Sequence, residues 1–199
     1  MEAVALLAGS GWASGINLYL VTLLLGVAGR LGWADIPDVL TRVDVMIVAG
    51  TLFAVEFVAD KIPYLDSVWD VIHTVIRPLG AAAIGAVIAG DSANIGTAVG
   101  AIVAGALAFD AHAAKASTRV VVNTSPEPVS NIGLSLAEDV GVAGLVTLAV
   151  TYPLVTLIVV GFLVVGATVL TIWLWRSARR SWKRVGAWFA EKPWYRAGG

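Results

Sequence analysis

Long apolar segments separated by short polar breaks run along most of the chain. They cover about residues 3–29, 43–60, 65–90, 95–115 and 140–175. A helix needs roughly 20 apolar residues to cross the hydrocarbon core of a bilayer, and most of these segments reach this length. The pattern predicts an all-α, polytopic helical membrane protein with about five crossings.

The first apolar segment contains a break. Residues 9–15 hold three glycines and two serines, a composition that disfavours a continuous helix. We expect a new helix to start at Ile16 with Ser14 as its N-cap, so that the first crossing is a broken helix.

The third segment is amphipathic at its start. Between residues 65 and 79, apolar side chains take one face at helical spacing, and Asp66, Asp70, His73 and Arg77 form a stripe on the other. This stripe needs water or polar partners. Pro78 predicts a kink before the small-residue run that follows.

The last third of the chain combines a polar stretch with one long apolar segment. Residues 118–139 are too polar to face lipid, and their centre predicts a loop feeding a short helix. The last crossing, about residues 140–175, is longer than a bilayer requires and contains Pro153. It must therefore tilt, kink or extend beyond the membrane.

Composition also indicates a membrane location. Apolar residues make up 58% and charged residues 14% of the chain, and the mean hydropathy is +0.85, far from the average soluble domain. The 199 residues suffice for one bundle, which we place at residues 1–175, followed by a tail at 176–199. The absence of cysteine excludes disulfides and thiolate metal sites.

The tail is strongly basic. Seven of the thirteen lysines and arginines lie in the last 24 positions, directly after Trp173 and Trp175. Basic residues that alternate with apolar ones beside a membrane span are typical of an amphipathic helix on an anionic leaflet. Membrane lipids are therefore the expected partner, and nucleic acid is not. The expected lipid-binding residues are Arg176, Arg179, Arg180, Lys183 and Arg184.

The basic residues also predict an orientation. If five crossings alternate, Arg30, Arg42 and the tail lie on one side of the membrane, together with the turn at Asp91. Because cytoplasmic segments are enriched in lysine and arginine, this side and the C-terminus are predicted to be cytoplasmic.

Ionisable residues recur inside the apolar segments in two clusters, residues 56–61 and 110–115, and each places an acid five residues before a lysine. Charges at membrane depth are costly and are often functional. We expect Glu56 to pair with Lys115, or Asp110 with Lys61. The residues expected to line a path for an ion or polar solute are Glu56, Asp60, Lys61, Asp70, His73, Arg77, Asp110, His112 and Lys115.

A structural interpretation of the same charges stays open. They can be internal ion pairs that fix helix register, and the expected pairs are then Asp70 or Glu56 with Arg77 or Lys115.

Metal binding and catalysis are further alternatives. Asp66, Asp70 and His73 offer oxygen and imidazole ligands, although the nearby Arg77 argues against a bound cation. Two aspartates four residues apart also resemble magnesium-dependent membrane transferases, but those enzymes have larger bundles. No nucleophile elbow, phosphate loop or zinc-protease motif is present, and no cofactor is expected.

An internal repeat links the two ends of the chain. Residues 14–20 match residues 130–136 at four of seven positions. An inverted repeat would bring two helix N-termini together at mid-membrane, where free N–H groups can hold an anion. In a chain rich in glycine, serine and leucine, such a match also arises by chance. The N-termini would be marked by Ser14, Asn17, Ser130 and Asn131.

The run at residues 55–63, followed by Asp66, Asp70 and Arg77, resembles the bacterial membrane family catalogued as domain of unknown function 4126. Residues 14–17 at one end and Glu138 at the other fit the same family, so the resemblance covers about residues 8–150. It implies an integral protein of the bacterial inner membrane with unassigned activity, and it transfers no functional residues.

Together, these features predict a small transporter or channel that binds a small ion or polar solute in an internal charged cavity. A chain with so few helices is expected to work as a homo-oligomer. The alternative is a non-transporting accessory or structural subunit of a larger membrane assembly.

Overall fold

A computed structural model describes residues 1–62, 65–93, 95–123 and 128–190, and the side chains only as far as residue 180. The described ranges contain six helices and no strand: α1 (Glu2–Arg30), α2 (Val43–Ala59), α3 (Leu65–Gly90), α4 (Thr97–Val122), α5 (Pro128–Thr151) and α6 (Pro153–Ala190). All except α2 are long and apolar enough to cross a membrane. The chain is therefore an all-α, multi-pass membrane protein. The expected number of five long apolar helices is confirmed, but these five include both α5 and α6 and leave out α2, which was expected to be one of the crossings.

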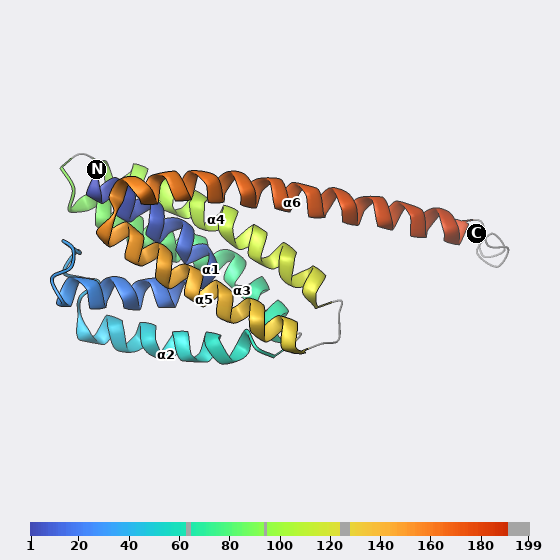
Figure 1. Ribbon diagram of the computed structural model, residues 1–199, viewed down its shortest axis with the longest axis horizontal. Coiled ribbons are helices and arrows are strands. Elements are labelled where there is room, and N and C mark those ends of the chain that lie inside the picture. The colour runs from blue at the N-terminus through green and yellow to red at the C-terminus, as the bar shows by residue number, and fades with distance from the viewer. Residues whose placement is uncertain (63–64, 94, 124–127, 191–199) are drawn as a thin grey trace.

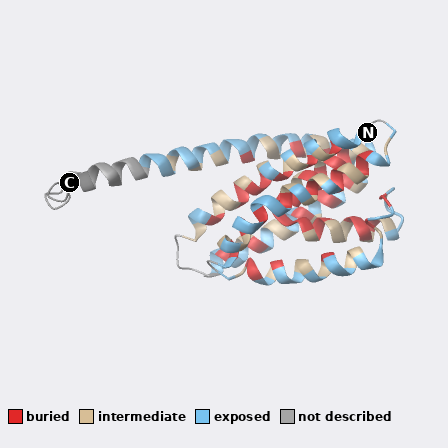
Figure 2. Cartoon of the chain, turned by 180° about the vertical axis from the view of Figure 1, so that it is seen from behind, coloured by how far each residue is buried: buried red, intermediate tan, exposed pale blue. Residues whose placement is uncertain are grey.

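The helices turn their apolar faces outwards. On α3, Val68, Val71 and Val75 are exposed, whereas the predicted polar stripe is buried. Figure 2 shows exposed residues along the outer faces of the helices and buried ones between them. Exposed valines and a buried charged stripe suit a bundle surrounded by lipid, because lipid tails solvate apolar side chains and polar groups must find partners inside.

Helix α1 is a hairpin rather than a crossing. Asn17 has non-helical angles, φ −150° and ψ 96°, and its Oδ1 accepts the N–H of Leu20 at 2.9 Å, so it caps the second half-helix. Glu2 at the start of this segment and Trp33 just beyond its end line one cavity, and Figure 1 shows the second half of α1 returning to the side of the bundle from which the first half starts. The predicted break is confirmed, but it lies at Asn17, and Ser14 does not cap a helix.

The two ends of the bundle are defined by residues that meet there. At the N-terminal end, Glu2, Asp91 and Val150 surround a common cavity. At the C-terminal end, Asp66 contacts Asn123. Helices α2 to α6 run alternately between these ends, and α6 continues past the C-terminal end (Figure 1). The predicted placement of the Asp91 turn beside the C-terminus is wrong, because the last apolar segment is two helices, so three helices rather than two follow this turn.

Pro153 separates α5 from α6. A proline has no N–H to donate and disfavours helical geometry at the residue before it, here Tyr152. The predicted single last crossing is therefore wrong, and so is the short helix before it, since α5 runs from Pro128 to Thr151. The centre of the predicted loop, residues 124–127, lies outside the described residues, as does Pro63. Residues 176–190 continue α6 without a break.

Small residues allow the helices to pack closely against one another. A Cβ on Gly15 would meet the carbonyl oxygen of Ala108 at 2.2 Å, and one on Gly85 would meet the carbonyl oxygen of Gly100 at 2.4 Å. The backbones of α1, α3 and α4 therefore touch directly, as glycine and alanine allow in membrane bundles.

We expect Gly15→Ala to lower the melting temperature, because the added methyl group would push the α1 hairpin away from α4 backbone. Gly144→Ala on α5 is the matched control, since nothing lies within 4 Å of its Cβ position. Thermal unfolding of both variants in the same detergent tests this, and equal melting temperatures would contradict the direct backbone contact.

Candidate functional site

Seven ion pairs join eight side chains in the interior, each at most 12% exposed. We call this set the charged core. It lies in the C-terminal half of the bundle, where α2 ends and α5 begins, and α3 and α4 supply the rest. Its members are Glu56, Asp60, Asp66, Asp70, Arg77, Lys115, Arg119 and Glu138.

Arg77 organises one part of the charged core. Its guanidinium donates to Glu56 Oε1 at 2.5 Å and to Asp70 Oδ1 at 3.1 Å. It also donates to His112 Nδ1 at 2.8 Å and to the main-chain oxygen of Gly15 at 3.3 Å. A single side chain thus joins α2, α3, α4 and the tip of the α1 hairpin.

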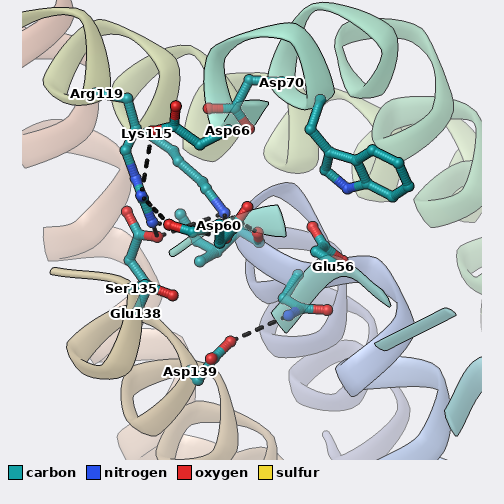
Figure 3. A network of polar contacts seen from close by, with 12 residues as sticks. Glu56, Asp60, Asp66, Asp70, Lys115, Arg119, Ser135, Glu138 and Asp139 are labelled. Atoms are coloured by element: carbon teal, nitrogen blue, oxygen red, sulfur yellow. Dashed lines mark hydrogen bonds and ion pairs between the residues drawn. The ribbon is translucent and has the colours of Figure 1, made fainter. Parts of the chain in front are cut away.

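Lys115 and Arg119 organise the other part. Lys115 donates to Asp60 Oδ2 at 2.7 Å and to the carbonyl oxygen of Ile16 at 3.1 Å. Arg119 donates to Glu138 Oε2 at 2.6 Å. In Figure 3, Asp60 lies in the middle, with Lys115, Arg119 and Glu138 on one side and Glu56 on the other. These contacts connect α5 to the same centre.

Three asparagine side chains form hydrogen bonds at the edges of the charged core. Asn131 Oδ1 accepts from Arg119 at 2.7 Å, and Asn123 Nδ2 donates to both carboxylate oxygens of Asp66 at 3.0 Å. Asn17 Nδ2 donates to Asp139 Oδ1 at 3.1 Å and ties the hairpin tip to α5. The charged core therefore extends from the hairpin tip to the C-terminal end of the bundle.

The two buried histidines are neutral in this arrangement. The Thr74 hydroxyl donates to the carbonyl oxygen of Asp70, so it accepts from His112 Nε2, and His112 Nδ1 must then accept from Arg77. His73 donates from Nδ1 to the carbonyl oxygen of Trp69 and accepts from Tyr19 at Nε2. Each imidazole has one donor and one acceptor nitrogen, as in its uncharged form.

The charged core consequently has an excess of acid. Five carboxyl groups face three cations, a formal charge of −2 if all are ionised. Three carboxyl oxygens also lack any hydrogen-bond partner among the described residues: Glu56 Oε2, Asp60 Oδ1 and Asp70 Oδ2. Their residues are 0%, 3% and 4% exposed. An uncompensated charge so deeply buried is strongly unfavourable. Uptake of positive charge by the charged core would therefore be favourable.

Two of the predicted site residues lie apart from the charged core. Lys61 sits over the ring of Phe57 and reaches Ser135 at 3.5 Å. Asp110 faces α6 and accepts from Thr168 at 2.7 Å. The predicted pairs of Glu56 with Lys115 and of Asp110 with Lys61 are therefore wrong.

The alternative pairs of Arg77 with Glu56 and with Asp70 are confirmed. Arg119 and Glu138 were not among the expected path residues. A signal existed for α5, because Asn131, Ser135 and Glu138 recur on one face of an apolar helix, as the acids of α3 do.

The sequence match between residues 14–20 and 130–136 does not correspond to a common backbone. The first segment breaks at Asn17, whereas α5 is helical through Asn131. Among the described residues, no three histidine, aspartate or glutamate side chains are arranged to hold a metal ion. Asp66 and His73 instead have protein partners.

Two further charged features lie apart from the charged core. Arg42 donates two hydrogen bonds to Asp44 and lowers the pKa of that exposed carboxyl to about 2. In the basic tail, the Arg179 guanidinium lies 3.5 Å from the ring centre of Trp175. The side chains of Lys183 and Arg184 lie outside the described residues.

We expect Arg77→Gln to lower the free energy of unfolding by about 3–5 kcal/mol, because it leaves Glu56 and Asp70 buried without their cation. Arg42→Gln removes an exposed partner and should cost at most about 1 kcal/mol. Chemical unfolding of both variants in mixed micelles measures the difference. Similar losses would show that Arg77 does not hold the bundle together.

Comparison with known proteins gives a family and no activity. A family model described as domain of unknown function (DUF4126) matches residues 4–176, which includes every member of the charged core. No curated protein and no solved structure matches the chain. The match extends the resemblance seen in the sequence at both ends and stops where the basic tail begins. The chain belongs to the DUF4126 family.

Proposed function

We propose that the protein transports protons across the membrane and that the charged core is the centre that binds them. The excess of buried acid supports this proposal. With five carboxyl groups, three cations and two neutral histidines, the centre approaches neutrality only when it takes up about two positive charges. The unpartnered oxygens of Glu56, Asp60 and Asp70 are the places where protons would bind.

The distances favour a proton over a hydrated ion. The main contacts of Arg77, Lys115 and Arg119 with carboxylates are 2.5–2.7 Å, so paired side chains touch without intervening water. A proton binds to a carboxyl oxygen without needing any further volume, whereas a metal ion needs several ligands around it.

We further propose an orientation with the C-terminus in the cytoplasm of a bacterial cell. Arg176, Arg179 and the rest of the basic tail follow the C-terminal end of the bundle, against Arg30 and Arg42 at the other end. The positive-inside rule then places the charged core on the cytoplasmic side, with Asp66 and Asn123 nearest the C-terminal end of the bundle. The tail would bind anionic inner-membrane lipids.

The test is proton flux into liposomes that contain a trapped pH-sensitive dye. Glu56→Gln and Asp70→Asn should each reduce the flux at least about tenfold, because an amide keeps the volume of the side chain but cannot take up the proton. Both variants should keep or raise the melting temperature, since each removes one excess negative charge. Asp110→Asn is the matched control, because this carboxyl group of α4 contacts Thr168 outside the charged core, and it should retain most of the flux.

The competing outcome is also defined. If the wild type moves no protons, Na⁺, Mg²⁺ or phosphate, and Glu56→Gln and Asp70→Asn mainly unfold the protein, then the ion pairs are structural. The accessory-subunit interpretation would then replace transport.

A further inference from the structure

A polar stripe runs along the first half of the α1 hairpin. Ser10, Ser14 and Asn17 are spaced by four and three residues and therefore share one helical face. Ser10 and Ser14 are both 0% exposed, and neither hydroxyl has a hydrogen-bond partner among the described residues. This is unusual, because a buried serine in a helix commonly donates to the carbonyl oxygen one turn before it.

Packing does not explain these hydroxyls. An unpartnered buried polar group costs about 1–3 kcal/mol, and alanine would fill nearly the same space without that cost. Alanines do occupy equivalent fully buried positions nearby, at Ala5 and Ala13 of the same half-helix. Two unpartnered serines one turn apart, among residues where alanine fits, require another explanation.

The stripe connects two features of the bundle. At its inner end, the carbonyl oxygens of Gly15 and Ile16 accept from Arg77 and Lys115 of the charged core. One turn before Ser10, on the same face, is Leu6.

Leu6 lines a cavity of about 260 Å³ at the N-terminal end of the bundle. Three carboxyl groups, from Glu2, Asp35 and Asp91, also line this cavity. The stripe therefore lies between this acidic cavity and the charged core.

We infer that Ser10 and Ser14 form the second half of the proton route, from the charged core to the acidic cavity. The inference rests on the proposed function. From Ser10 to Asn17 the helix rises about 10 Å, roughly a third of the hydrocarbon core. Because neither hydroxyl is hydrogen-bonded to the other, the route requires water molecules that bridge the gaps between them. Each hydroxyl then accepts a proton on its oxygen from one water and releases its own to the next, so no atom is lost and no charge accumulates. Leu6 is the apolar barrier between Ser10 and the cavity.

The experiment compares four variants in the same proton-flux assay, each with its melting temperature. The double variant Ser10→Ala/Ser14→Ala should reduce flux about fivefold or more and keep or raise the melting temperature, because it removes unpartnered hydroxyls. Leu6→Ser should increase flux without lowering the melting temperature, the opposite of what loss of folded protein does. Thr51→Ala is the control for loss of a hydroxyl, since Thr51 lies on α2 and donates to its own helix at Ile47. Asp70→Asn reports on the charged core itself.

The outcomes separate the two proposals. Absence of wild-type flux refutes the proposed function. Wild-type flux that depends on Asp70 but is unchanged in the double serine variant and in Leu6→Ser refutes the route and leaves the charged core intact. A fall in melting temperature of the double serine variant, without a gain of flux in Leu6→Ser, also refutes the route, because the hydroxyls would then be structural.

Discussion

The structure depends on three buried cations that bind both carboxylates and main-chain carbonyl oxygens. Arg77 and Lys115 bind the oxygens of Gly15 and Ile16, in the last turn before α1 breaks. Arg119 binds the oxygen of Asp60, where α2 ends. A helix that ends inside a bundle leaves carbonyl groups without partners, and lipid offers none. The hairpin and the end of α2 are therefore tolerated at this depth because cations satisfy their free oxygens.

Because these three cations lie together in one half of the bundle, the polarity of the interior differs between its two halves. Around them, the C-terminal half is polar and contains more acid than base. In the N-terminal half, Gly15, Gly85 and Gly100 bring helix backbones into contact, and the interior is almost entirely apolar. Ser10 and Ser14 are exceptions in that half. A charged centre near one end of the bundle, separated from the other end by tightly packed backbones, suits a protein that moves protons without leaking other ions.

Much of this fold could be predicted from local patterns. Apolar residues at helical spacing on α3 predicted a separate polar face with Asp66, Asp70 and Arg77, which needed water or polar partners. The structure shows that this face is buried. The glycines and serines of residues 9–15 indicated a break. Its position was missed because the capping interaction depends on Asn17, which also needs Asp139 from the distant α5.

The site was harder to predict than the helices. Repetition of an acid and a lysine five residues apart suggested that Asp110 and Glu56 are equivalent, but α4 turns Asp110 towards α6 and Lys115 towards the core. Helix rotation, set by packing between distant segments, decides such pairings. The corner at Pro153 reverses the chain between α5 and α6, and this extra reversal places the Asp91 turn and the C-terminus at opposite ends of the bundle.

The most direct test of this account is whether the charged core holds protons at neutral pH. Infrared spectroscopy distinguishes the C=O stretch of a protonated carboxyl group from the bands of an ionised one. The account predicts protonated carboxyl bands in the folded wild type at neutral pH that weaken in Glu56→Gln and Asp70→Asn but not in Asp44→Asn, whose carboxyl group is exposed and paired with Arg42. A spectrum in which every carboxyl group of the folded protein is ionised would contradict it.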